Sequence, residues 1–317
     1  MEEYIGIDLG GTKILGIRIN EKLEVLDKER ILTGDSASSS EEVLGKVIYI
    51  IDRLNSGKVK NIGIGVAGFI DNNLGIVHGS PNIPAFKEVN IKAFLQDKTG
   101  FSVYVDNDAK CGALAELFVG SCKNIKDFLF ITFGTGIGSA IVSNGKIVRG
   151  KDNLAGEIGH ITLDPNGPIC SCGKRGCFEA FASGPSIREL YLDSLKGSSN
   201  SFLLNYVNGD VNLINTSLIF ALKDKDEISK NTLTFVADKI GIGLSIAVNL
   251  LNPEVIVIGG GLAEPLKAIW DDVESSFFRN TLKISAKSVK FEFSSLENDG
   301  VAIGSAILAA RMSEGPK

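Results

Sequence analysis

Two stretches, YIGIDLGGTKILGIRI (residues 4–19) and FLFITFGTGIGSAIVSNGKIV (residues 128–148), share one design. Each has an apolar run typical of a β-strand, a glycine-containing turn and a second apolar run. When Gly10 is laid over Gly134, Asp8 falls on Thr132 and the apolar runs coincide. A repeated supersecondary pattern of this kind indicates internal duplication. We therefore expect two related domains, each beginning with a hairpin.

Helix-like and strand-like segments alternate outside the two hairpins, which predicts an α/β protein. Residues 41–54 have the spacing of an amphipathic helix, and residues 61–70 return to a strand pattern. Residues 103–120 pass from a strand into a helix, for which Asp106 or Asp108 is the predicted N-cap.

The later part of the chain continues the alternation. Residues 233–266 predict a long helix, a proline stop, a buried strand and a triple glycine that opens another helix. Residues 195–212 are rich in Ser, Asn and Gly, and we expect a mobile surface loop there.

Length and charge narrow the function classes. A chain of 317 residues is long enough for about two domains. The net charge of −5 is small, and the sequence has no run of basic residues of the kind that follows a phosphate backbone. Nucleic acid is therefore not expected as a partner. The first residues lack a basic segment followed by an apolar one, which predicts a cytoplasmic protein with reduced thiols and no membrane association.

Three glycine clusters follow strand-like runs, at residues 8–13, 132–138 and 258–262. Glycine lets backbone N–H groups converge on an anion, although a single cluster is more often a plain tight hairpin. The P-loop string is absent, and GTGIG is followed by a strand rather than the helix of a dinucleotide fingerprint. Phosphate-binding hairpins in duplicated domains resemble the two-lobed actin-like ATPase (ribonuclease H-like) fold, which places the nucleotide in an interlobe cleft.

Three of the five cysteines lie in ICSCGKRGCFE, residues 169–179. With the upstream histidine they make a Cys3His set suited to tetrahedral zinc: His160, Cys170, Cys172 and Cys177. The alternatives are a satisfied core imidazole and buried small hydrophobic cysteines. An odd number of cysteines in a reducing compartment disfavours a disulfide framework.

The motifs together resemble the ROK family of repressors, open reading frames and sugar kinases, on its glucokinase side. They are DLGGTK, PN at 81–82, DNDA at 106–109, FGTGIG, AGEIGH at 155–160, CSCGKRGC and E..ASG at 179–184. The resemblance extends from about Tyr4 to Met312. It implies an ATP-dependent hexose kinase that transfers the γ-phosphoryl group to a 6-hydroxyl, with a structural zinc ion, Mg²⁺ and a homodimeric state.

The resemblance also implies residue roles. Asp108 resembles the catalytic base. The expected sugar contacts are Asn82, Asn107, Asp108, Glu157, His160 and Glu179. The expected nucleotide contacts are Asp8, which would lie near Mg²⁺, and Gly10, Gly11, Thr12, Lys13, Thr132, Gly134, Thr135, Gly136, Gly184, Gly259, Gly260 and Gly261. Taken singly, the asparagines could be turn residues, Glu157 a surface acid and Asp108 only a helix cap.

Two positions depart from the family pattern. Lys110 stands where the family usually has Asn, and it would lie in the first turn of a helix, where the macrodipole disfavours a cation. Phe86 stands where the glucokinases often have Trp. Glucose is the first expectation for the substrate, with N-acetylglucosamine, mannose or fructose as alternatives.

Two other functions are weighed against a kinase. A sugar-sensing regulator of the same family would add an N-terminal helix-turn-helix, and the first strand is predicted at about Tyr4. An actin-like assembly ATPase would explain the glycine turns but not the sugar-pocket acids. The expected small lobe is 1–118 with 300–317, and the expected large lobe, which carries the zinc-binding loop, is 119–299.

Overall fold

The computed structural model describes residues 2–34, 39–197, 201–296 and 298–313. The chain forms two compact units. The first contains residues 1–130, 140–156 and 294–317, and the second contains residues 131–139 and 157–293. The lobe bounds expected from the sequence stay a prediction, and the observed units group residues 119–130 and 140–156 with the N-terminal part of the chain.

The first unit is built on a five-stranded sheet of order β3-β2-β1-β4-β8. Strands β1 and β2 form the predicted hairpin, β3 extends it in antiparallel fashion, and β4 and β8 continue in parallel from β1. The bounds are β1 Glu3–Leu9, β2 Lys13–Asn20, β3 Val25–Leu32, β4 Val59–Val66 and β8 Ser102–Asn107.

A second five-stranded sheet has the order β11-β10-β9-β12-β13. Its strands occupy the positions of the first sheet in the same sequence order, so β9 corresponds to β1 and β12 to β4. Strands β12 and β13 are parallel, as β4 and β8 are. The repeated strand order is the structural form of the duplication predicted from the two hairpins. The bounds are β9 Phe128–Phe133, β10 Ile137–Ser143, β11 Lys146–Ile147, β12 Val255–Gly259 and β13 Lys290–Phe293.

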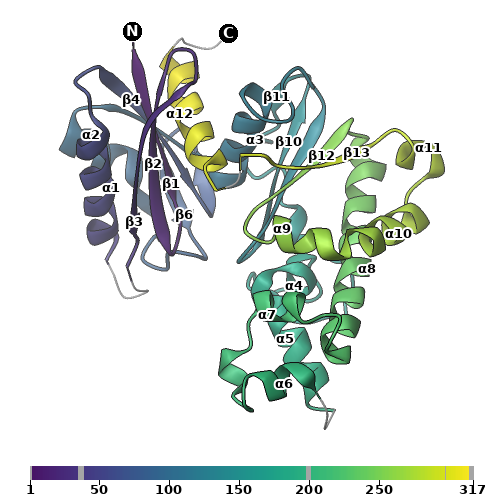
Figure 1. The fold of residues 1–317 in the computed structure, drawn as a ribbon. Helices are drawn as coiled ribbons and strands as arrows, with labels where there is room; N and C mark the ends of the chain where they lie inside the picture. The colour runs from purple at the N-terminus through teal and green to yellow at the C-terminus, as the bar shows by residue number, and fades with distance from the viewer. Residues whose placement is uncertain (1, 35–38, 198–200, 297, 314–317) are drawn as a thin grey trace. The chain divides into compact units, whose positions relative to one another are not determined.

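Helices cover both faces of the first sheet (Figure 1). Because side chains alternate along a strand, Ile5 and Ile7 pack with helices α1 and α2, whereas Tyr4 packs with helix α12 on the opposite face. Helix α3 lies beside α12. The bounds are α1 Ser40–Leu54, α2 Ile91–Thr99, α3 Asp108–Phe118 and α12 Gly300–Ser313.

Helix α12, from the far end of the chain, packs unusually close to its neighbours because glycines line the contact. A Cβ atom at Gly6 or Gly63 would collide with the backbone of α12, at Ala302 and Ser305 respectively. A Cβ atom at Gly304 would collide with the carbonyl of Cys111 in α3. The backbones of β1, β4, α3 and α12 are thus in direct contact.

The remaining elements are a small sheet in the first unit and the helices of the second unit, one of which is long. The first unit also has a three-stranded sheet of β5 Phe69–Asp71, β6 Ile76–Gly79 and β7 Val89–Asn90. The second unit has η1 Ile158–His160, α4 Glu179–Ala182, α5 Gly184–Leu195, α6 Phe202–Tyr206, η2 Val211–Leu213, α7 Thr216–Ala221, α8 Glu227–Leu251, α9 Ala263–Leu266, η3 Lys267–Ile269, α10 Trp270–Asn280 and α11 Lys283–Ala286. Helix α8 is long and apolar enough to cross a membrane by composition, but 56% of its apolar window is buried inside the protein, as in a core helix.

Two local expectations are corrected by the structure. The N-cap of α3 is Asn107 rather than Asp106 or Asp108, because the Asn107 side chain accepts hydrogen bonds from the amides of Ala109 and Lys110. The segment 195–212 contains α6 and η2, so the described part of it is not a plain loop, and residues 198–200 lie outside the described residues. Ser201 caps α6, and Asn208 and Gly209 adopt left-handed conformations just after it, which accounts for part of the composition that suggested a loop.

The close packing of α12 predicts opposite effects for the same substitution in two helices. Gly304→Ala should lower the free energy of unfolding by about 1–3 kcal/mol, because the added methyl group meets backbone that cannot move aside. Gly45→Ala in the exposed part of α1, where a Cβ atom meets nothing within 4 Å, should raise it by up to about 1 kcal/mol. Calorimetric unfolding of both variants tests this, and two shifts of the same sign would contradict the proposed contact.

Candidate functional site

The carboxyl ends of three parallel strands bring the first group of predicted residues together. In the strand register Asp8 of β1 pairs with Gly65 of β4, and Gly65 pairs with Asp106 of β8. The chain then enters α3 through Asn107 and Asp108. Ligands of parallel α/β sheets bind beyond this edge, so the sheet itself places Asp8 and Asp108 where a ligand is expected.

The β1–β2 turn lies at the same edge. The amide of Gly10 donates to the carbonyl of Lys13 over 3.1 Å, and the Thr33 hydroxyl donates to the carbonyl of Gly10 over 2.7 Å. Gly11 passes so close to Asn82 that a Cβ atom would strike the Asn82 carbonyl. The turn therefore needs glycine at this position, and Asn82 lies directly against it.

The start of α3 positions Asn107 and Asp108 differently. Asn107 is used as the cap, and its Nδ2 donates to the carbonyl of Gly68 over 3.3 Å. The Asp108 carboxylate accepts from the amide of Ala109 over 2.9 Å and stays partly exposed. Because Asn107 performs the capping, Asp108 is not required as the helix cap.

The two carboxylates have raised pKa values. Desolvation, followed by the negative charge of Asp108, raises the pKa of Asp8 to about 7, against a smaller opposing effect of Lys13. Desolvation also raises the pKa of Asp108, while the backbone amides at its helix start and then the Lys110 cation act in the opposite direction. Paired acids with perturbed pKa values are typical of functional sites.

In the second unit, three of the predicted glycine segments meet. The amide of Gly134 donates to the carbonyl of Gly136 over 3.0 Å, and the amide of Gly184 donates to the carbonyl of Gly134 over 2.8 Å. Gly260 adopts a φ of +86° against the backbone of Phe133, a conformation that glycine takes without strain. The β9–β10 turn, the start of α5 and the turn after β12 thus form one cluster of backbone groups.

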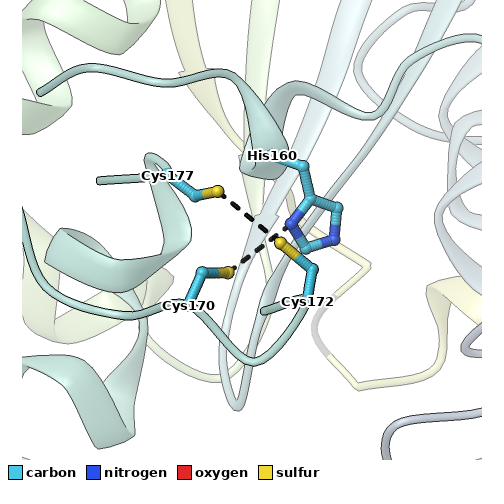
Figure 2. A group of neighbouring side chains, drawn as sticks. All are labelled: His160, Cys170, Cys172 and Cys177. Carbon is cyan, nitrogen blue, oxygen red and sulfur yellow. Dashed lines mark hydrogen bonds between the residues drawn. The ribbon is translucent and has the colours of Figure 1, made fainter. Parts of the chain in front are cut away.

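His160 and the three cysteines also come together (Figure 2). Their four candidate ligand atoms all lie within 4.8 Å of one another. The Sγ atoms of Cys172 and Cys177 are 3.7 Å apart, and Cys170 Sγ lies 3.7 Å from His160 Nδ1. Tetrahedral Zn²⁺ with Zn–S bonds of about 2.3 Å separates two sulfurs by about 3.8 Å, so the donor set and its spacing fit this ion.

The alternative of a disulfide does not fit the same geometry. A disulfide needs an S–S distance of about 2.05 Å, and all five cysteines are free. Desolvation, followed by its contact with Cys172, raises the pKa of the Cys177 thiol to about 12. A metal ion would offset this, because binding replaces the thiol proton.

Glu179 links this cluster to the β9–β10 turn. Its Oε2 accepts from the amide of Ile137 over 2.9 Å, and its Oε1 accepts from the Ser171 hydroxyl over 2.7 Å. Gly136 lies so close to the same carboxylate that a Cβ atom there would crowd it. Ser171, which motif reasoning did not single out, thereby connects the cysteine loop with a carboxylate of the predicted sugar site.

Glu157 and His160 stand at the two ends of the single turn η1. The amide of His160 donates to the carbonyl of Glu157 over 3.1 Å, and side chains three residues apart in a 3₁₀ turn lie on one side of it. Since His160 Nδ1 faces the cysteines, its Nε2 is the nitrogen left for another partner.

The predicted residues therefore fall into one group in each unit. The first unit holds Asp8, Gly10, Gly11, Thr12, Lys13, Asn82, Asn107 and Asp108; the second holds Thr132, Gly134, Thr135, Gly136, Glu157, His160, Cys170, Cys172, Cys177, Glu179, Gly184, Gly259, Gly260 and Gly261. Sequence reasoning missed the side chains that support the start of α3, Arg149 and Asn153, because their partner Asp106 is more than 40 residues away.

Comparison with known proteins gives consistent matches. A glucokinase of Halalkalibacterium halodurans is 33% identical over 310 residues, which is 95% of this chain and 93% of that protein. A xylose repressor of Caldicellulosiruptor bescii is 29% identical over 95% of this chain and 76% of its own length. The crystal structure of a ROK family glucokinase from Streptomyces griseus, in complex with glucose and AMPPNP, superposes with a TM-score of 0.84 at 27% identity over 98% of this chain and 99% of that chain.

The fold is accordingly the two-lobed actin-like ATPase fold of the ROK sugar kinases, as the paired hairpins predicted. The sequence model of the ROK family matches residues 4–312, the range over which the motifs resembled it. This chain belongs to the ROK family.

Proposed function

We propose that the chain is an ATP-dependent hexose kinase that transfers the γ-phosphoryl group of ATP to the 6-hydroxyl of a hexose, with glucose as the first candidate. The observation that carries the proposal is the meeting of Asp8, Asn107 and Asp108 at the carboxyl edge of β1, β4 and β8, beside a glycine turn. A base, a magnesium-compatible carboxylate and phosphate-binding amides are the parts that phosphoryl transfer needs.

In this proposal Asp108 accepts the proton of the attacking hydroxyl. Its raised pKa makes it a stronger base than an exposed aspartate, and the cation of Lys110 helps to keep it ionised. Asn82 and Asn107 provide amide groups, and Glu157, His160 Nε2 and Glu179 provide further partners that suit the hydroxyls of a sugar. The side-chain oxygen of Asn107 already accepts the hydrogen bonds of the helix cap. Asn107 would therefore contact the sugar through Nδ2.

Nucleotide binding is assigned to the glycine turns. Their backbone amides are expected to donate to phosphate oxygens without any side chain intervening. Asp8 would hold Mg²⁺, directly or through water, since a hard cation prefers carboxylate oxygen. When bound, the magnesium ion would offset the charge that develops on the phosphates.

Zn²⁺ is proposed as a structural ion held by His160, Cys170, Cys172 and Cys177. With four protein ligands it has no open position, so it would supply order rather than chemistry. Two contacts suggest that ordering of the cysteine loop by zinc would also order neighbouring parts of the predicted sugar site. The Ser171 hydroxyl joins the loop to Glu179, and Glu179 joins it to the β9–β10 turn.

A sugar-responsive regulator is the second candidate, because xylose repressors also match over 95% of this chain. The assay of purified protein with ATP, Mg²⁺ and a panel of glucose, N-acetylglucosamine, mannose and fructose separates the two. ADP release that depends on one hexose supports the kinase. Saturable sugar binding without ADP release would overturn it in favour of the regulator.

Asp108→Asn should lower kcat by about 10²- to 10⁴-fold while dissociation constants for hexose and ATP stay close to wild type. Asparagine keeps the shape of the side chain but cannot accept the proton. Asp97→Asn, on the exposed part of α2, is the matched control and should be silent. A kcat within threefold of wild type would show that the base lies elsewhere.

Zinc analysis by mass spectrometry should find one ion per chain. Cys172→Ala should lose it together with thermal stability and activity, because Cys172 is the exposed ligand and its removal opens the site. Cys122→Ala, which removes a buried cysteine outside the cluster, should retain the metal. A fully active, metal-free Cys172→Ala protein would contradict the positional role.

In protein free of Mg²⁺ and nucleotide, the Asp8 carboxyl should titrate near pH 7, and Asp108→Asn should lower that pKa because a like charge is removed. Since the folded pKa lies above the unfolded value of about 4, stability falls as pH rises from about 4 to 7. Asp8→Asn should therefore raise the melting temperature at pH 8 and change it little at pH 4. Carbon-13 NMR and calorimetry measure both, and an ordinary titration near pH 4 would contradict the coupling.

A further inference from the structure

Lys110 is a buried cation in an unfavourable place. It is 1% exposed, and it lies in the first turn of α3, where the partial positive charge of the helix N-terminus opposes it. Burial of an ammonium group away from water adds a second cost. A residue with both costs persists only where its neighbours provide strong compensation.

Part of the compensation comes from a loop 43 residues later in the chain. Lys110 Nζ donates to the backbone carbonyl of Asn153 over 2.8 Å. Asn153 is itself 5% exposed and has a φ of +59°, a left-handed conformation that asparagine tolerates better than most residues. The carbonyl that receives Lys110 is thus presented by a specific backbone conformation.

The side chain of Asn153 holds that conformation in place. Its Nδ2 donates to Asp106 Oδ1 over 3.1 Å and to the carbonyl of Ile70 over 3.2 Å. Its Oδ1 accepts from Arg149 Nη1 over 2.9 Å. Arg149 also forms an ion pair with Asp106, whose side chain is fully buried. Both the nitrogen and the oxygen of the Asn153 side-chain amide therefore have hydrogen-bond partners.

Asp106 and Lys110 stand two residues before and two residues after Asp108, and both are joined to Asn153. The backbone that carries the Asp108 carboxylate is thus anchored on both sides to one residue of the 149–153 loop. Asn107 adds a link to Gly68, two residues before the Ile70 carbonyl that Asn153 also contacts. Such anchoring restricts where the carboxylate can move.

We propose that Lys110 and Asn153 are positioning residues that fix the Asp108 carboxylate in its reactive orientation, through the Lys110–Asn153–Asp106 network. This rests on the proposed function, because it takes Asp108 as the base. A displacement of about 1 Å in a reacting group costs up to about 100-fold in rate, so loss of one anchor should lower turnover without removing the binding contacts.

The test is a comparison of turnover and binding in Lys110→Met, which keeps most of the aliphatic stem and removes the donor. We expect kcat to fall by about 10- to 100-fold, while the dissociation constants for hexose and for a nonhydrolysable ATP analogue change by less than about threefold. Lys98→Met, at the exposed end of α2, removes an equal charge away from the network and should leave kcat unchanged.

Asn153→Gly is the second variant, because it keeps the left-handed conformation and the carbonyl but removes the side-chain links. A lower kcat with intact binding is expected for it as well, and it decides the matter if Lys110→Met does not fold. A kcat within threefold of wild type in a folded variant would overturn this inference but leave the proposed function intact. Absence of hexose-dependent turnover in the wild-type protein would overturn the proposed function, and the inference with it.

Discussion

The contact of α12 with the first sheet is the constraint on which the candidate site depends. Helix and strand backbones usually stay apart because side chains separate them, but Gly6, Gly63 and Gly304 remove that layer. As a result one helix touches both β1, which ends at Asp8, and α3, which begins at Asp108. The backbones that carry the two acids therefore both contact helix α12. Close-packed protein interiors resist small displacements, so this shared contact limits how far the acids can move.

Much of the fold and part of the site could be predicted from the sequence. The two hairpins share a pattern of apolar runs and glycine, which depends only on local geometry, and the equal strand orders of the two sheets agree with it. The Cys3His set was also visible, because Cys170, Cys172 and Cys177 are close in sequence and need only tight turns to meet. Predictions succeeded where the physical cause is local in the chain.

Sequence-based predictions were wrong, or none could be made, where a contact between distant segments of the chain decides the local structure. Asp106 looked like a helix cap, but Arg149 and Asn153 bind its carboxylate, so Asn107 caps α3 instead. Lys110 looked unfavourable in a helix start, and its burial is explained by contacts of the folded chain, among them its hydrogen bond to the carbonyl of Asn153. A side chain that conflicts with local rules marks a place where tertiary structure, and often function, has decided the residue.

The same reasoning applies to the charge of the site. Asp8 and Asp108 repel each other at the end of the sheet, and this repulsion contributes to the raised pKa of Asp8. The ionised Asp8 lowers the stability of the fold, whereas the close contact of α12 and the Asp106–Arg149 ion pair support the backbones of both acids. The contacts that hold these backbones do not involve the two carboxylates. The carboxylates therefore stay close together and repel each other until a cation or a proton neutralises one of them. In the proposed function, such a site would attract a divalent ion and a proton-donating hydroxyl together, as phosphoryl transfer to a sugar requires.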